Sequence, residues 1–283
     1  MSSWHHDLLG PEQAGFIESR LGDPTLVEDL SWGIVDTRVL HVRAGSDEFV
    51  VKTAGPGNHH IGREIAAHER WTAALVQLDR TARFVAGDRE RNVLITEYQP
   101  GRLVEGGELE LSPDIHRQAG KTLRAFHDQH ERVDPEYEAR ATRKALAALD
   151  GEHRIAPEIA EEARGILAGY RPRPARVVPT HGDWHPRNWL QDAGRLRAID
   201  FGRFDFRPAL TDLCRLATQQ WLDAPALEAA FLEGYGTDPL DAEVWPIELL
   251  REAVGTATWA YRVGDFAFET HGHRLLGAAL ARC

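Results

Sequence analysis

The sequence has little sulfur and no long apolar run, and these absences exclude several classes of protein. Its 283 residues include only two cysteines, Cys214 and Cys283, which are too few for a disulfide framework and lie in no spacing typical of zinc ligands. No stretch approaches the roughly 18 consecutive apolar residues of a membrane-spanning helix, and the first residues lack the charged and apolar regions of a signal peptide. We therefore expect a reduced, cytoplasmic protein that has no membrane partner.

Positive charge is also scarce. The chain has 33 Lys and Arg against 44 Asp and Glu, which gives a net charge of −11 and an isoelectric point near 5.7. Because such a surface repels phosphate backbones and anionic lipids, we expect no nucleic-acid partner. Hydrophobic residues make up 42% of the chain and charged residues 27%, as in ordinary globular proteins, and the length suits one large domain or two smaller ones.

The hydrophobic periodicity changes near Pro100 and Gly101. Before this point the pattern predicts one helix at 61–78 and strands at 26–30, 34–42, 48–52, 83–86 and 92–98. After it, a strand-rich stretch at 177–201 lies among predicted helices at 113–126, 136–150, 157–170, 209–222, 224–235, 242–263 and 270–281. The sequence therefore predicts an α+β protein with a small N-terminal lobe at 1–98 and a larger helical C-terminal lobe at 99–283.

The strand-rich stretch carries the most specific pattern in the chain. It reads THGDWHPRNWL at 180–190 and AIDFG at 198–202. Asp183 and Asn188 are five residues apart, as in the catalytic loop of kinases, and the D-F-G triplet that begins at Asp200 follows twelve residues later. Phosphoryl transfer needs a carboxylate that orients and deprotonates the acceptor hydroxyl, together with oxygen ligands for Mg²⁺. These residue types at this spacing therefore predict a phosphotransferase.

The same motifs resemble the aminoglycoside phosphotransferase (antibiotic kinase) family. The resemblance extends over roughly residues 30–215 and includes a second histidine two residues after the aspartate. It implies a bilobal protein-kinase-like fold, with a small antiparallel-sheet N-lobe that carries one helix and a larger helical C-lobe. It also implies that Asp183 is the catalytic base, that Asn188 and Asp200 are Mg²⁺ ligands, and that His185 lies near the γ-phosphate.

The resemblance assigns nucleotide binding to the N-terminal half. Lys52 ends the strand FVVK, as the ATP-binding lysine does in kinases, and would hold the α- and β-phosphates. Its ion-pair partner is expected on the next helix, where Glu64 is the first choice and Glu69 remains an alternative. Gly33 is the single glycine of a degenerate phosphate loop.

The segment TEYQPG at 96–101 resembles the hinge that binds the purine. The backbone of Glu97 and Gln99 would pair with the purine edge. The small side chain of Thr96 leaves room for adenine, so ATP is the expected donor, and GTP remains open.

The implied reaction is Mg²⁺-dependent transfer of the γ-phosphate of ATP to a hydroxyl of a small molecule. The acceptor is expected to be an antibiotic; a metabolic acceptor of the choline, fructosamine or methylthioribose type is an alternative, as is a nucleotide-binding pseudokinase. Residues 207–283 contain 11 acidic and 6 basic side chains, a balance that favours a cationic acceptor. Asp205, Asp265 and Glu269 are the candidate carboxylates for it, although an ordinary solvated surface explains the charge almost as well.

Overall fold

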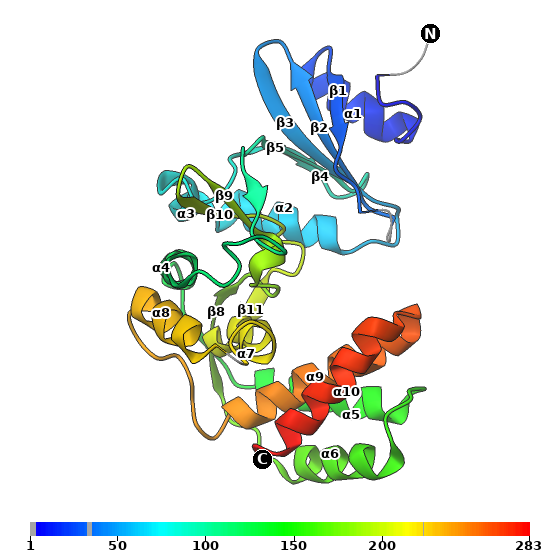
Figure 1. The fold of residues 1–283 in the computed structure, drawn as a ribbon. Coiled ribbons are helices and arrows are strands. Elements are labelled where there is room, and N and C mark those ends of the chain that lie inside the picture. Colours follow the sequence, from blue (N-terminus) through cyan, green and yellow to red (C-terminus); the bar gives the residue numbers. More distant parts are fainter. Residues whose placement is uncertain (1–3, 33–35, 223) are drawn as a thin grey trace. The chain divides into compact units, whose positions relative to one another are not determined.

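The computed structural model describes residues 4–32, 36–222 and 224–283 (Figure 1). These residues form two compact units, each assembled from several stretches of the chain. The first consists of residues 1–129, 181–205 and 229–236, and the second of residues 130–180, 206–228 and 237–283. The lobe boundary at residues 98 and 99 stays a prediction. None of the helices among the described residues is long and apolar enough to cross a membrane.

The first unit contains an antiparallel five-stranded sheet in the order β1-β2-β3-β5-β4. Its strands are β1 (Thr25–Asp29), β2 (Arg38–Ala44), β3 (Asp47–Thr53), β4 (Phe84–Asp88) and β5 (Val93–Glu97). The helices that accompany it are α1 (Pro11–Leu21), α2 (His60–Arg70) and α3 (Ala73–Gln77).

The side chains of β3 and β5 alternate between the two faces of this sheet. Val51 packs on the face covered by α1, whose Ile17 is fully buried there. Leu94 packs on the other face against Ile65 of α2. Lys52 follows Val51 in β3 and is paired with Leu94 across the strands, so alternation places its side chain on the face of α2.

A smaller sheet in the order β10-β9-β6 supports the segment that carries the kinase-type motif. Its strands are β6 (Arg102–Leu103), β9 (Trp189–Asp192) and β10 (Arg195–Ala198). A short 3₁₀ helix, η1 (Pro186–Asn188), leads into β9, and the D-F-G triplet follows β10. Both halves of the motif are therefore attached to the same antiparallel hairpin.

Aromatic rings from distant parts of the first unit meet around the D-F-G phenylalanine. Phe201 is fully buried. Its ring centroid lies 5.4 Å from that of His68 in α2, 5.4 Å from that of Phe126 in α4 (Pro113–His127) and 4.7 Å from that of His181. This core ties α2 and α4 to the two motif segments.

Helix α4 also packs closely on the C-terminal part of α8 (Pro225–Tyr235). A Cβ atom on Gly120 would lie 2.1 Å from the carbonyl oxygen of Phe231, and one on Gly234 would lie 1.9 Å from that of Arg117. Only glycine allows the two backbones to approach so closely.

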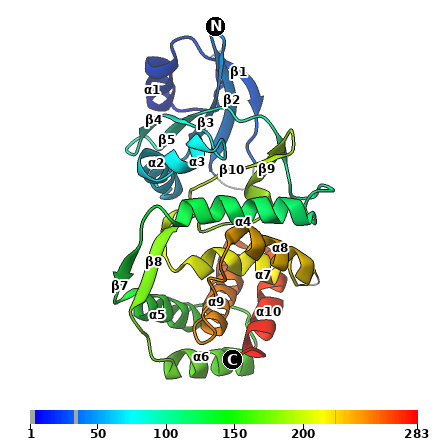
Figure 2. The same ribbon diagram turned by 90° about the vertical axis from the view of Figure 1, so that its left-hand side faces the viewer.

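The second unit is built mainly from helices and a three-stranded sheet in the order β11-β8-β7. Figure 2 shows α9 and α10 side by side, together with α5 and α6, and Leu250 and Leu276 are fully buried in their core. The elements are β7 (Arg132–Asp134), β8 (Ala175–Thr180), β11 (Asp205–Arg207), α5 (Tyr137–Asp150), α6 (Pro157–Gly169), the 3₁₀ helix η2 (Ala209–Leu213), α7 (Cys214–Thr218), α9 (Trp245–Val263) and α10 (Phe266–Leu280).

The structure differs from the sequence prediction in two helices of the first unit. The helix predicted at 61–78 is interrupted after Arg70, and α3 begins at Ala73. The backbone N–H groups of Trp71 and Thr72 both donate to the carbonyl oxygen of Ala67, at 2.7 and 3.2 Å, so the regular bond to the fourth preceding residue is lost at Thr72. Helix α1 was not predicted, because only two of its residues are buried and its apolar stripe is short.

The ring of His68 makes the stability of this core depend on pH. Its pKa is lowered to about 3 because burial disfavours the imidazolium, and because the Lys52 ammonium repels it. The unfolded chain takes up this proton near pH ~6.5, whereas the folded chain resists it until about pH 3. The stabilisation is therefore complete above the unfolded pKa and is lost as the pH falls below it.

We predict that His68→Phe reduces this pH dependence while preserving the ring contacts with Phe201. Between about pH 7.5 and about pH 5, the free energy of unfolding of the wild type should fall by about 2 kcal/mol more than that of the variant. Urea unfolding at the two pH values measures the difference, and His59→Phe, at an exposed position beside α2, is the control. Equal pH dependence in wild type and His68→Phe would contradict a buried neutral imidazole.

Candidate active site

A buried ion pair joins β3 to α2. The Nζ atom of Lys52 donates to Oε1 of Glu64 at 2.8 Å and to Oε2 at 3.0 Å. The side chain of Glu64 is only 4% exposed and that of Lys52 15%. Glu69 instead pairs with Arg89 at 2.6 Å near the surface, so the structure pairs Lys52 with the first of the two predicted glutamates.

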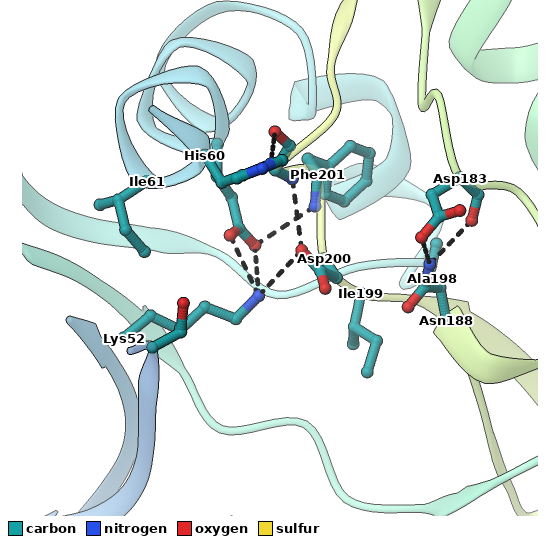
Figure 3. A network of polar contacts seen from close by, with 12 residues as sticks. Lys52, His60, Ile61, Asp183, Asn188, Ala198, Ile199, Asp200 and Phe201 are labelled. Atoms are coloured by element: carbon teal, nitrogen blue, oxygen red, sulfur yellow. Dashed lines mark hydrogen bonds and ion pairs between the residues drawn. The ribbon is translucent and has the colours of Figure 1, made fainter. Parts of the chain in front are cut away.

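The D-F-G aspartate completes this cluster (Figure 3). Oδ1 of Asp200 lies 3.4 Å from Nζ of Lys52, and the backbone N–H of Phe201 donates to Oε1 of Glu64 at 3.3 Å. Asp200 has a φ of 66°, a left-handed conformation that costs energy for a residue other than glycine. The surrounding contacts hold this conformation, which turns the carboxylate toward Lys52 while the next side chain enters the aromatic core.

The three charges set one another's ionisation. Burial disfavours the ammonium of Lys52, but the carboxylates of Asp200 and Glu64 outweigh it and raise its pKa above the usual value. Partial loss of solvent and the charge of Asp183 oppose ionisation of the half-exposed Asp200 carboxyl, yet the Lys52 ammonium outweighs both and lowers its pKa. Lys52 and Asp200 are therefore both charged at neutral pH.

The second motif segment holds its aspartate and asparagine together. Nδ2 of Asn188 donates to the carbonyl oxygen of Asp183 at 2.7 Å and to Oδ2 of its carboxylate at 3.1 Å. His181 steadies the turn, because its Nδ1 accepts from the backbone N–H of Asp183 at 3.3 Å and its Nε2 is 3.0 Å from the carbonyl oxygen of Ile199. These two contacts fix the tautomer with the proton on Nε2 and link the Asp183 turn to the D-F-G segment.

His185 lies against the same carboxylate. Its Nε2 is 3.6 Å from Oδ1 of Asp183, and the His185 side chain is 6% exposed, against 21% for that of Asp183. Neither ring nitrogen makes a hydrogen bond to any residue that the structure describes. The predicted position of His185 near a γ-phosphate agrees with this buried polar ring but stays a prediction.

Asn188 and Asp200 fit the requirements of a Mg²⁺ site. Because both hydrogen bonds of the Asn188 amide group use its nitrogen, its oxygen is left for a cation. The Asp200 side chain is 52% exposed, and its contacts with Nζ of Lys52 and with the backbone N–H of Gly202 both use Oδ1. No cluster of three or more His, Cys, Asp or Glu side chains suited to a metal occurs in the described part of the chain.

The predicted purine-binding residues lie at the end of β5. The backbone N–H of Glu97 donates to the carbonyl oxygen of Arg83 at 2.9 Å, so its carbonyl oxygen is the group left for a purine. Gln99 follows in a segment without regular structure. Gly33 lies outside the described residues. The nucleotide roles of all three positions stay predictions.

The predicted acceptor carboxylates differ in their surroundings. Asp205 is exposed at the start of β11. Asp265 caps α10 by accepting the backbone N–H of Phe268 at 3.0 Å. Glu269 is buried and pairs with Arg154 at 3.0 Å, so its charge is already balanced within the second unit. Their roles toward an acceptor stay predictions.

The sequence did not indicate a further contact of the D-F-G segment. Nδ1 of His60, at the start of α2, donates to the carbonyl oxygen of Gly202 at 2.9 Å. A Cβ atom on Gly202 would lie 3.1 Å from Oδ1 of Asp200 and 3.2 Å from Cβ of His60, so glycine suits this position. No spacing rule could have found the contact, because the two residues are 142 positions apart.

Three solved structures with the same fold are distant from this chain in sequence. The choline kinase of Streptococcus pneumoniae is 15% identical, with a TM-score of 0.66 over 95% of this chain and 99% of that chain. The macrolide 2′-phosphotransferase of Brachybacterium faecium is 18% identical, with a TM-score of 0.61 over 92% of this chain and 96% of that chain. A thermostable mutant of an aminoglycoside phosphotransferase, solved with ADP and hygromycin B, is 14% identical, with a TM-score of 0.64 over 95% of this chain and 97% of that chain.

These similarities confirm the predicted α+β, protein-kinase-like fold. No curated protein matches the chain. The model of the phosphotransferase enzyme family, however, matches residues 27–246, well over half of the chain. The chain therefore belongs to this family of small-molecule phosphotransferases, as its motifs predicted.

Proposed function

We propose that this chain transfers the γ-phosphate of ATP to a hydroxyl group of a small molecule in the presence of Mg²⁺. The observation that carries the proposal is that the unit containing residues 181–205 assembles two groups at once. One is the Lys52, Glu64 and Asp200 cluster, and the other is the Asp183 and Asn188 turn. Phosphotransfer requires both a cationic donor site and a base for the acceptor.

In this proposal the first group binds the donor. The Lys52 ammonium, fixed by Glu64, donates to the α- and β-phosphates, and the backbone of Glu97 and Gln99 pairs with the purine. Asn188 and Asp200 would hold Mg²⁺, which neutralises the phosphate charge when it is bound. Similar structures solved with ADP and with AMP support a nucleotide donor. We expect ATP rather than GTP because the small side chain of Thr96 leaves room for adenine.

Asp183 then acts on the acceptor. Its carboxylate accepts the proton of the acceptor hydroxyl while the hydroxyl oxygen forms a bond to the γ-phosphorus. The bond from that phosphorus to the bridging oxygen breaks, and its electron pair leaves with ADP. The contact of Asn188 Nδ2 with Oδ2 at 3.1 Å orients this carboxylate.

We further propose that the acceptor is cationic, with an aminoglycoside or basic peptide antibiotic as the first choice. Exposed Asp205 and Asp265 would attract it. A metabolic acceptor of the choline, fructosamine or methylthioribose type is the second candidate. The choline kinase among the similar structures favours it, because choline also combines a hydroxyl with a positive charge.

We predict that Asp183→Ala lowers kcat by about 10²–10⁴-fold with little effect on nucleotide binding, because it removes the general base. Asp183→Asn should be nearly as damaging, because the amide keeps the shape but takes up no proton. Steady-state phosphate transfer and calorimetric ADP binding measure the two effects. Asp128→Asn, at the residue that directly follows α4 and whose exposed carboxylate pairs with Arg124, is the matched control, and a kcat within about threefold of wild type in Asp183→Ala would reject the assignment.

We also predict that Asp200→Ala and Asn188→Ala raise the Mg²⁺ concentration needed for half-maximal ADP binding. The effect of Asp200→Ala should be larger, because a full negative charge holds a divalent cation better than an amide dipole does. Mg²⁺ titrations of ADP binding measure it without knowledge of the acceptor. Unchanged midpoints in both variants, with Asp128→Ala as the control, would rule out the metal roles.

The charge of the acceptor predicts a salt dependence. For a cationic acceptor, KM should rise as ionic strength increases from about 0.05 M to about 0.5 M. Salt screens attraction between charges that are farther apart than the Debye length, which is about 10 Å at about 0.1 M and shortens as salt is added. Phosphate transfer to a panel of aminoglycosides, peptide antibiotics, macrolides and choline identifies the acceptor. Asp205→Asn and Asp265→Asn should flatten the salt response if these residues contribute. A flat response for the best acceptor would contradict the cationic proposal and leave phosphotransfer intact.

A further inference from the structure

An arginine of the motif segment stacks on an aromatic ring that is far from it in the sequence. The guanidinium carbon of Arg187, in η1, lies 3.9 Å from the ring centroid of Trp32. Both side chains are exposed, Trp32 by 49%. Within the described residues, Arg187 makes no hydrogen bond or ion pair with any side chain or backbone group. An arginine without a carboxylate partner is unusual in a chain that has 44 acidic residues and a net charge of −11.

Stacking holds a guanidinium in place without using its hydrogen-bond donors. The cation–π contact uses the flat face of the group, whereas its N–H donors point outward in the plane. That arrangement of donors matches the oxygens of a phosphoryl group, which it can bind through two hydrogen bonds at once. Arg187 is therefore positioned by Trp32 and keeps its donors for a ligand.

The backbone beneath Arg187 is fixed beside the candidate catalytic residues. The next residue, Asn188, donates from its backbone N–H to the carbonyl oxygen of His185 at 2.9 Å and from its side chain to Asp183. On the other side, the backbone N–H of Glu105 donates to the carbonyl oxygen of Pro186 at 3.3 Å. The side chain of Arg187 thus extends from the same rigid turn that presents Asp183 and Asn188.

The two residues before Trp32 are held in place by hydrogen bonds. The backbone N–H of Ser31 donates to Oδ1 of Asp29 at 2.9 Å, and its hydroxyl accepts from the backbone N–H of Val39 at 3.0 Å. The backbone N–H of Leu30 donates to the carbonyl oxygen of Val39 at 2.8 Å. Trp32 therefore directly follows an ordered end of the β1 and β2 pair. The next residue in the sequence is Gly33, the glycine predicted for the phosphate loop.

The charges of the site show why a second cation is needed there. Lys52 supplies one positive charge, whereas Glu64, Asp183 and Asp200 supply three negative ones. Because Glu64 is buried, its carboxylate needs the Lys52 ammonium as its ion-pair partner. A nucleotide triphosphate adds further negative charge, of which a divalent cation offsets only a part. In P-loop enzymes an arginine that contacts the transferring phosphoryl group is a recurrent solution to this problem.

We infer that Arg187 is a phosphate-binding residue, held in position by the Trp32 ring, whose guanidinium donates hydrogen bonds to the terminal phosphoryl group of the bound nucleotide. The inference rests on the proposed phosphotransfer and assigns a role in it to a residue at one of the variable positions between Asp183 and Asn188. Lys52 holds the inner phosphates in this arrangement, and Arg187 recognises the phosphate that is transferred. A contact with an anionic group on the acceptor is the competing role, and the experiment separates the two.

The experiment compares the binding of Mg²⁺·AMP-PNP with that of Mg²⁺·ADP by calorimetry. Arg187→Ala should weaken AMP-PNP binding by about tenfold or more and leave ADP binding nearly unchanged, because charge-assisted hydrogen bonds to the terminal phosphate are lost. Arg187→Lys should lie between the two, since it keeps the charge without the planar donors. Trp32→Ala should show a smaller loss of the same kind, and Trp32→Phe should stay close to wild type because it retains an aromatic face.

The matched control is Arg20→Ala, which removes an arginine that stacks on Phe16 in α1, with its guanidinium carbon 5.2 Å from the ring centroid. It should leave both affinities unchanged. An affinity ratio within about twofold of wild type in Arg187→Ala would overturn the inference, and reduced turnover with an unchanged ratio would overturn it in favour of an acceptor contact. If Lys52→Ala weakens the binding of both AMP-PNP and ADP in the same assay, the proposed function stands even where the inference about Arg187 fails. Failure of the wild type to bind either nucleotide would instead reject the proposed function, and this inference with it.

Discussion

The burial of one carboxylate, that of Glu64, constrains the rest of the candidate site. A charged side chain that is 4% exposed is strongly destabilising unless a cation and hydrogen-bond donors satisfy it. Lys52 supplies the cation and the backbone N–H of Phe201 supplies a donor. These contacts connect β3, α2 and the D-F-G segment, so none of the three can shift without leaving Glu64 unsatisfied. The site is rigid at this point for electrostatic reasons.

The aromatic core reinforces the same geometry by packing. Asp200 faces the charge cluster and Phe201 enters a core of rings from α2, α4 and the Asp183 turn. Two adjacent side chains thus serve opposite environments, and the left-handed conformation of Asp200 is the backbone turn that accompanies this arrangement. The neutral imidazole of His68 suits the apolar side of the division, because a charged ring there would face both burial and the Lys52 ammonium.

The sequence predicted those parts of the fold and site that depend on local spacing. The Asp183, Asn188 and Asp200 pattern was recognisable because phosphotransfer needs these residue types at fixed intervals along one hairpin. Lys52 was recognisable from the end of a strand. The structure selects Glu64 over Glu69 because their separation of five positions in the sequence places the two side chains on different faces of α2, one buried and one exposed.

Features that depend on long-range geometry could not be predicted. The break between α2 and α3 lies where the backbone N–H groups of Trp71 and Thr72 share the carbonyl oxygen of Ala67, and α1 buries too few residues to give a strong period. The contact of His60 with Gly202 joins positions 142 residues apart. The excess of acidic residues in 207–283 overstated the available negative charge, because some of these carboxylates, such as Asp241 and Glu269, pair with arginines outside that segment.

The two cations proposed for nucleotide binding differ in what holds them, and this difference suggests a division of roles. Lys52 is fixed by the buried carboxylate of Glu64, so moving its ammonium would leave that charge uncompensated at a cost of several kcal/mol. Arg187 rests on an exposed ring through a contact worth about 1 kcal/mol, so its guanidinium can change partner at little cost. A fixed cation suits the inner phosphates, which are the same before and after the reaction. A cation that is easily released suits the terminal phosphoryl group, because that group moves from donor to acceptor and must then leave the site.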